Sequence, residues 1–183
     1  MSSREWATAW SVTRALQTHW PMPAYIAPEA LVRGSCVHAL TARIDSALDA
    51  EPPPDTPDIE GWVSAYRRFL TDLTPQFTGV EEPVESVDLD CHGIIDRIGC
   101  FDDGRRFVLD IKTGAKRPAD AIQCAAYVSL LVPGEYDSVD RYGLYIRKDG
   151  SYRLRPYTNQ YDFVTWLRVL ETARRSAEGE THG

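Results

Sequence analysis

Several features that define whole classes of protein are missing from this sequence. No apolar run among the 183 residues approaches the ~20 that a membrane-spanning helix needs. The first residues lack the apolar segment of a secretory leader, and the early Glu5 argues against a transit peptide. The four cysteines form no C-x-x-C pair, so the common zinc and iron–sulfur spacings are absent and reduced, buried thiols are expected. These absences predict a cytoplasmic protein with no membrane partner.

The composition is that of an ordinary globular protein, but its charge is unevenly distributed. Hydrophobic residues make up 43% and charged residues 26% of the chain, and its length fits a single domain. The net charge is −7, yet residues 1–95 hold six Lys and Arg against fourteen Asp and Glu, whereas residues 96–183 hold fourteen against thirteen. A polyanion should therefore meet the second part of the chain, although an unevenly charged solvated surface explains the same numbers.

Hydrophobic periodicity predicts helices first and a sheet afterwards. A capping box at Ser2 and Glu5, followed by Trp6, Trp10 and Trp20 at helical spacing, predicts a first helix. Further helices are expected at 28–50, 59–73 and 118–131 and from 159, with an extended loop at 51–57 and strands at 80–89, 91–101, 106–112, 141–147 and 152–157. We expect an α+β fold with a central mixed β-sheet flanked by helices. It would form one domain over 1–175, with a helical lobe at 1–74, a sheet core at 75–175 and a flexible tail at 176–183.

The chemistry is concentrated around one predicted hairpin. Side chains alternate along a strand, so Asp110 and Lys112 lie on one face. Counting inward from the turn Asp102-Asp103-Gly104 places Asp96 near Asp110 across the pair. Like charges opposite each other destabilise a sheet unless a cation neutralises them. Mg²⁺ or Mn²⁺ accepts carboxylates and leaves room for phosphate oxygens, which suits phosphodiester hydrolysis. The alternative is a surface salt bridge between Asp110 and Lys112.

Other polar residues indicate a functional site only when they are considered together with this hairpin. His38 lies on the second predicted helix and can supply a nitrogen ligand, while Gln123 and Tyr127 lie one turn apart on a later helix. Each has an ordinary alternative as a surface or half-buried residue. The acidic residues Glu81, Glu82 and Glu85 are expected on a solvent-facing strand edge. The alternative is that one of them assists at the site, and the sequence does not identify which.

In this order, the motifs R-G-x-x-x-H, G-I-I-D, V-L-D-I-K-T-G and Q-x-x-x-Y resemble the RecB-type branch of the PD-(D/E)XK nucleases, over about Arg33 to Tyr127. The resemblance implies a restriction-endonuclease-like core. It also implies metal ligation by His38, Asp96, Asp110 and the Ile111 backbone carbonyl. Catalytic roles fall to Asp96, Asp110 and Lys112. Residues that would support the site or contact DNA are Arg33, Gln123, Tyr127, Arg97, Lys116 and Arg117.

The resemblance predicts a Mg²⁺- or Mn²⁺-dependent deoxyribonuclease, an exonuclease acting on single-stranded DNA or DNA ends, with a recombination or replication protein as a further partner. Some relatives carry a four-cysteine iron–sulfur cluster, which we do not expect because no cysteine follows Cys124. The expected location is the cytoplasm of a bacterium or a phage-infected host. Two alternatives are a catalytically silent or partner-activated DNA-binding module of the same fold, and an unrelated interaction protein. Endonuclease activity, cleavage polarity and strand preference are left open by the sequence.

Overall fold

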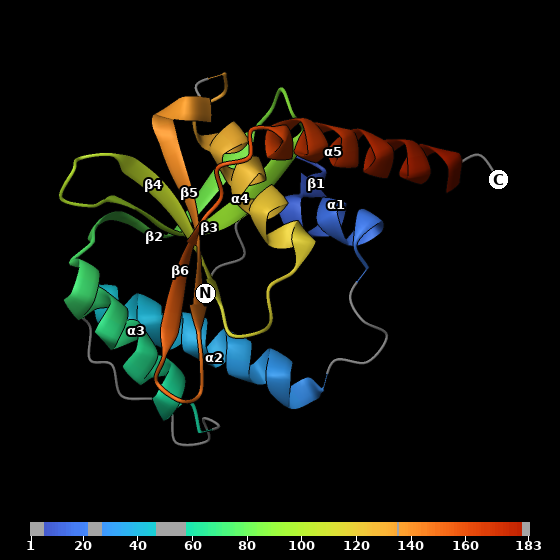
Figure 1. Cartoon of the computed structure of the whole chain (residues 1–183). Coiled ribbons are helices and arrows are strands. Elements are labelled where there is room, and N and C mark those ends of the chain that lie inside the picture. The colour runs from blue at the N-terminus through green and yellow to red at the C-terminus, as the bar shows by residue number, and fades with distance from the viewer. Residues whose placement is uncertain (1–5, 22–26, 47–57, 135, 181–183) are drawn as a thin grey trace.

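The computed structural model describes residues 6–21, 27–46, 58–134 and 136–180, which form a mixed sheet between two groups of helices (Figure 1). The helices are α1 (Val12–His19), α2 (Pro28–Asp45), α3 (Glu60–Leu73), α4 (Pro118–Leu131) and α5 (Tyr161–Glu180), with a short 3-10 helix at Tyr136–Ser138. The strands are β1 (Trp10–Ser11), β2 (Gln76–Ser86), β3 (Cys91–Cys100), β4 (Arg106–Lys112), β5 (Val139–Ile146) and β6 (Tyr152–Pro156).

The sheet combines three antiparallel pairs with two parallel pairs, β1–β3 and β4–β5. Its order is β1-β3-β4-β5-β6, and β2 pairs with β3 outside this path. The pairs β2–β3, β3–β4 and β5–β6 are antiparallel, whereas β4–β5 is parallel because α4 connects these two strands. The predicted α+β fold with a central mixed sheet flanked by helices is confirmed.

One edge of β3 is interrupted, and this interruption creates the site. Strand β1 pairs with Cys91 and His92, while β4 pairs with β3 only from Arg97 to Cys100. Both strands use the edge of β3 opposite β2, because β2 pairs with the same residues on the other side. The intervening stretch of β3, residues 93–96, therefore has no ladder partner on that edge, which leaves room for side chains.

The two faces of the sheet carry separate hydrophobic cores. Helices α1, α4 and α5 cover one face, where Val108 packs in the same cluster as Trp166. Helices α2 and α3 cover the other face, where Phe107 and Leu109 pack with Phe69. Figure 1 shows α2 and α3 on one side of the strands and α4 with α5 on the other. Alternation along β4 explains this division, since successive side chains enter opposite layers.

The N-terminal helix is shorter than the sequence predicts. Trp10 and Ser11 form β1, with Trp10 paired in parallel with Cys91, and α1 starts only at Val12 after the Ser11 hydroxyl caps it by accepting from the Arg14 amide at 3.1 Å. None of the three tryptophans lies within α1: Trp6 precedes β1, Trp10 lies in β1, and Trp20 directly follows the helix. The capping box at residues 2 and 5 lies outside the described residues.

The ends of several other strands and helices also differ from those predicted from the sequence. Strand β2 begins at Gln76 and ends at Ser86, and α2 ends at Asp45, while the loop expected at 51–57 lies outside the described residues. Helix α5 continues to Glu180, so the chain is helical for five residues into the segment predicted as a tail. Across the described ranges, no helix is both long enough and apolar enough to cross a membrane.

Candidate metal and catalytic centre

Asp96 lies at the interruption in the β3 edge and is the centre of the site. The residue is only 7% exposed. Its Oδ2 accepts a hydrogen bond from the Ile111 amide at 2.6 Å, and its Oδ1 lies 3.4 Å from His38 Nδ1. The β3–β4 ladder ends one step away, at Arg97 and Leu109. The carboxylate thus occupies the place of a ladder acceptor, which explains how it is buried without leaving the neighbouring strand unsatisfied.

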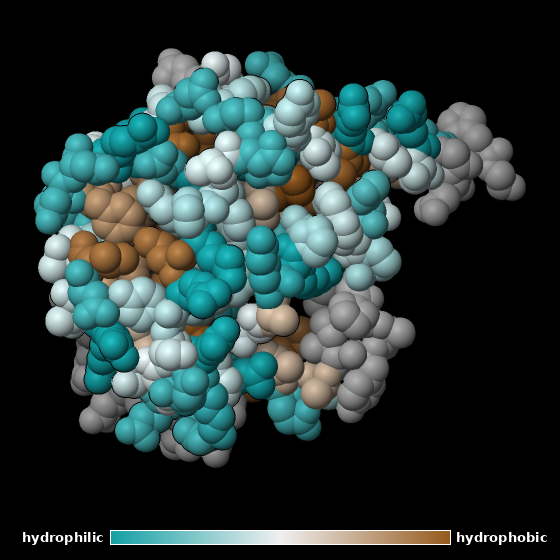
Figure 2. Space-filling model, viewed as in Figure 1, coloured by the Kyte–Doolittle hydropathy of each residue, from teal (hydrophilic) through white to brown (hydrophobic). Residues whose placement is uncertain are grey.

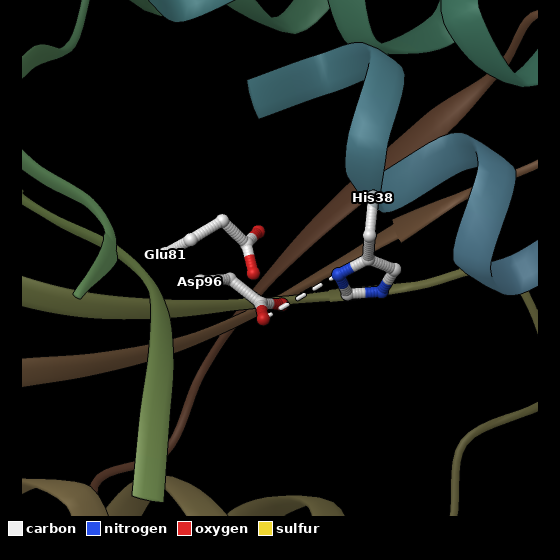
Figure 3. Close-up of side chains that lie close together, drawn as sticks. All are labelled: His38, Glu81 and Asp96. Carbon is white, nitrogen blue, oxygen red and sulfur yellow. Dashed lines mark ion pairs between the residues drawn. The ribbon is translucent and has the colours of Figure 1, made fainter. Parts of the chain in front are cut away.

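Glu81 joins this centre, contrary to the solvent-facing position expected for it. The register on either side of it, Val80 with Arg97 and Glu82 with Ile95, places Glu81 opposite Asp96. Ligand atoms of His38, Glu81 and Asp96 all lie within 4.8 Å of one another. Figure 3 shows these side chains converging from β2, β3 and α2. The sequence left open that one of Glu81, Glu82 and Glu85 assists at the site, and it did not identify Glu81 because the predicted strand extended to residue 89.

The backbone at Glu81 is unusual in a way that serves this arrangement. Its φ of 50° lies in the left-handed region, which costs a non-glycine residue roughly 1–2 kcal/mol. No ladder partner is assigned to Glu81 itself, although both neighbours are paired. The register shift of β2 lies earlier, between Phe77 and Gly79, so the conformation at Glu81 is a local change within an unshifted ladder. It coincides with the turning of the Glu81 carboxylate toward the centre.

Asp110 and Lys112 form a second, adjoining group. Lys112 Nζ lies 2.6 Å from Asp110 Oδ2 and donates to Gln123 Oε1 at 2.9 Å. The amide of Gln123 in turn donates to the Tyr127 hydroxyl at 2.8 Å. A continuous polar chain therefore connects the end of β4 to α4. Asp110 is not part of the compact His38–Glu81–Asp96 group, because its carboxylate faces the lysine.

Burial and close charges shift the pKa values of the centre in opposite directions. Burial raises the pKa of Asp110 to about 6, with Lys112 opposing the shift and Asp96 adding to it. For Asp96, burial is outweighed by His38 and by the Ile111 amide, which hold its pKa below the usual range. Burial alone would lower the pKa of His38, but Asp96 and further carboxylates raise it to about 9. Burial is likewise outweighed at Lys112, where Asp110 raises the pKa above its usual value, so the side chain is a cation at neutral pH.

Arg97 has a different place from the DNA contact that the sequence predicts. Its side chain is completely buried. The guanidinium donates to Glu81 Oε1 at 3.1 Å, to the Asp96 carbonyl at 2.6 Å and to Asp45. Further donations reach the hydroxyls of Thr41 at 3.0 Å and Tyr66 at 3.2 Å. With its donors satisfied inside the protein, Arg97 cannot contact a substrate and instead connects α2 and α3 to the site.

The remaining predicted residues lie around the centre. Gln123 and Tyr127 are in the polar chain, with Tyr127 only 4% exposed. Arg33 is half-buried, with its guanidinium 5.0 Å from the ring centre of Trp62. Lys116 is exposed in the loop between β4 and α4, and Arg117 beside it is half-buried. The contact described for Ile111 is made by its amide, and the ligand role of its carbonyl stays a prediction.

The donor set fits a hard divalent cation. Glu81, Asp96 and His38 offer two carboxylates and one imidazole within 4.8 Å of one another, and the buried carboxylate of Asp110 adjoins this group next to Lys112. Asp110 Oδ2 is buried and has the Lys112 ammonium close by, but no hydrogen bond of good geometry. Oxygen-rich sites with one nitrogen suit Mg²⁺ or Mn²⁺ better than Zn²⁺, for which tetrahedral cysteine and histidine sets are usual.

The sheet thus carries an acidic centre next to a lysine, held between two groups of helices. The model of the PD-(D/E)XK nuclease superfamily matches residues 7–181, and the chain therefore belongs to this family. Nucleases of this superfamily use divalent metals.

Comparison with solved structures supports the fold. A structure named "Putative exonuclease", from Eubacterium rectale, has a TM-score of 0.60 at 12% identity and covers 98% of this chain and 87% of its own. The structure of SSO0001 has a TM-score of 0.50 at 15% identity, with 95% and 79% covered. At such identities the likeness concerns the fold alone. A search of curated proteins found no match.

Proposed function

We propose that this protein is a Mg²⁺- or Mn²⁺-dependent deoxyribonuclease of the RecB-type branch, which hydrolyses phosphodiester bonds at DNA ends. The observation that carries the proposal is the convergence of half-buried His38 and Glu81 with buried Asp96 beside the Asp110–Lys112 pair. Burying carboxylates close to one another costs free energy even when each has a cationic partner, and a bound divalent cation would offset that cost.

The metal would be held by the carboxylates of Glu81, Asp96 and Asp110 with the imidazole of His38. When bound, a divalent cation supplies charge stabilisation at the phosphate and lowers the pKa of a water molecule. The fold holds these side chains in place before substrate arrives. Asp96 is oriented by the Ile111 amide and Glu81 by Arg97. Such prior orientation avoids reorganisation during the reaction.

Lys112 acts as a fixed cation rather than as a base. Its raised pKa keeps it protonated at neutral pH. Two contacts, to Asp110 and Gln123, hold the ammonium group in place. An ammonium group has three donors, so one remains to stabilise negative charge that develops on the phosphate. Gln123 and Tyr127 are positioning residues, since they act on the reaction through Lys112.

The test is cleavage of DNA labelled at either the 5′ or the 3′ end, single- and double-stranded, with Mg²⁺, Mn²⁺ or EDTA. We expect metal-dependent loss of full-length DNA that is abolished in Lys112→Ala. The matched control Arg168→Ala removes an exposed positive charge from α5 and should cleave like the wild type. Cleavage that persists in EDTA, or that is equal in Lys112→Ala, would contradict the proposal. Absence of cleavage with DNA binding retained would favour the catalytically silent module.

A further inference from the structure

The face of the sheet that carries Asp110 and Lys112 continues into two arginines on β6. Asp110 pairs with Gly143 on β5, and Gly143 pairs with Arg155 on β6. In the next row, Lys112 pairs with Tyr145, which pairs with Arg153. Directly paired residues project to the same face, so both arginines share the face of the catalytic pair. Within each row, the β4 residue and the β6 arginine are two strand spacings of about 4.8 Å apart, which is about 10 Å in total.

These arginines line a basic hollow at the end of the sheet. The cavity has a volume of ≈ 390 Å³, and its charged lining residues are all positive: Lys116, Arg147, Lys148, Arg153 and Arg155. Lys148 has an exposed ion pair with Asp58. In the described part of the chain, no carboxylate forms an ion pair with the other four. Figure 2 shows hydrophilic side chains over the β5–β6 hairpin on the face in view. Cations gathered without acids are a favourable site for an anion.

Two neighbouring positive groups, the start of α4 and Arg141, do not contribute to this hollow. Helix α4 starts at Pro118, directly after the loop that carries Lys116, but the Asp120 carboxylate of its first turn already caps it by accepting from the Arg117 amide at 2.8 Å. Arg141, on the same hairpin, takes no part because it is buried and paired with Asp162 at 3.0 Å. On the β5–β6 hairpin, the arginines that form no ion pair with a described carboxylate, Arg147, Arg153 and Arg155, are therefore the ones at the hollow.

The opposite flank of the centre has the opposite charge. Strand β2 and the following turn, residues 76–90, contain five acidic residues and no Lys or Arg. Of these, Glu81 faces the centre and is paired with Arg97, whereas Glu82 is exposed. A polyanion that passed over both flanks would meet repulsion on the β2 side. A strand held on the β6 side alone would avoid it.

We propose that the hollow lined by Lys116, Arg147, Arg153 and Arg155 is a phosphate-binding subsite. It would hold the backbone of a nucleic-acid strand on the β6 flank of the catalytic centre. This assignment rests on the proposed nuclease function, which defines the polyanion as a nucleic acid. Contacts of this kind bind phosphates regardless of base sequence and weaken with salt. Binding on one flank also suits cleavage near the end of a nucleic-acid strand, because the few nucleotides beyond the scissile bond then need no binding site of their own.

The subsite is tested by binding, so that the result does not depend on cleavage. Fluorescence anisotropy of a fluorescein-labelled single-stranded DNA is measured in EDTA over a series of salt concentrations. The double variant Arg153→Gln/Arg155→Gln should bind more weakly, and its log–log salt slope should be smaller by about 1.4, the value for two lost phosphate contacts on a single strand. The matched control Arg168→Gln/Arg175→Gln removes two exposed charges from α5 and should keep the wild-type slope.

Equal salt slopes for the two double variants would overturn the subsite, as would a wild-type protein that does not bind the DNA. Circular dichroism spectra should match among the three proteins. The melting temperature of Arg153→Gln/Arg155→Gln should equal that of the wild type, because neither arginine forms an ion pair with a described carboxylate, and the control loses only the exposed pair of Arg175 with Glu171. The outcome is separate from that of the nuclease proposal. A protein that binds DNA through these arginines but shows no metal-dependent cleavage would retain the subsite and lose the proposed activity.

Discussion

Removing the carboxylate of Asp45 should destabilise this protein far more than removing an acid from its surface. The side chains of Asp45 and Arg97 are 2% and 0% exposed, and they are bonded directly to each other. In Asp45→Ala, the guanidinium would stay buried with its main counter-charge gone. Tyr66, whose hydroxyl donates to Asp45 at 2.6 Å, would lose its acceptor as well.

The magnitude follows from the burial of the pair. Breaking a buried ion pair by removing one partner costs about 3–5 kcal/mol. At about 2–4 °C per kcal/mol for a domain of this size, the melting temperature should fall by roughly 6–20 °C. The total stability of a domain is only about 5–15 kcal/mol, so the variant should remain folded but become measurably weaker.

The assay is urea denaturation followed by tryptophan fluorescence, with Asp140→Ala as the control. Asp140 forms an exposed pair with Arg105, whose side chain is 60% exposed, so its removal should cost at most about 1 kcal/mol. A loss for Asp45→Ala no larger than that for Asp140→Ala would refute the reasoning. It would mean that Glu81 and the remaining acceptors satisfy Arg97 without Asp45.

Four further results are expected. Glu81→Gln should reduce the thermal stabilisation given by Mn²⁺, whereas Glu82→Gln, on an exposed neighbour, should leave it unchanged; equal effects would remove Glu81 from the centre. Gly143→Ala should destabilise the fold by about 1–3 kcal/mol in chemical denaturation, because a Cβ there would lie 2.3 Å from the Tyr157 hydroxyl oxygen; a neutral result would show that this tyrosine moves freely. Cys91 should resist iodoacetamide in the folded protein at pH 8, since burial raises its pKa to about 12, and rapid labelling by mass spectrometry would contradict its burial. Linear single-stranded DNA should be degraded much faster than a circular strand, and equal rates on a gel would argue against action at ends.

Much of the catalytic pair was predictable because its geometry is local. Alternation along one strand places Asp110 and Lys112 on the same face, and in the structure Lys112 Nζ lies 2.6 Å from Asp110 Oδ2. Helical spacing brings Gln123 and Tyr127 together for the same reason. Glu81 could have been found by the same kind of counting. A turn at residues 87–90 pairs Ser86 with Cys91 and so places Glu81 opposite Asp96, but the predicted strand extended through that turn.

Arg97 shows where local reasoning ends. A basic residue next to a catalytic acid suggests a phosphate contact, and nothing in the neighbouring sequence indicates that acceptors on α2, α3 and β2 surround it. Burial of an arginine depends on whether distant segments supply enough acceptors to offset its desolvation. Those segments meet only when both helices have packed against the sheet.

The sequence by itself determined the alternation of layers, the hairpin that carries Asp96 and Asp110, and the order of motifs that indicates a nuclease. These features depend on side-chain periodicity and turn chemistry over a few residues. The tertiary structure alone decided that β1 and β4 share one edge of β3 and leave the interruption where Asp96 lies. It also decided that His38 reaches this position from α2, and that the β6 arginines share the face of Lys112. The physical reason is that strand order, register and burial are set by contacts between distant segments, whose free energies exist only in the assembled fold.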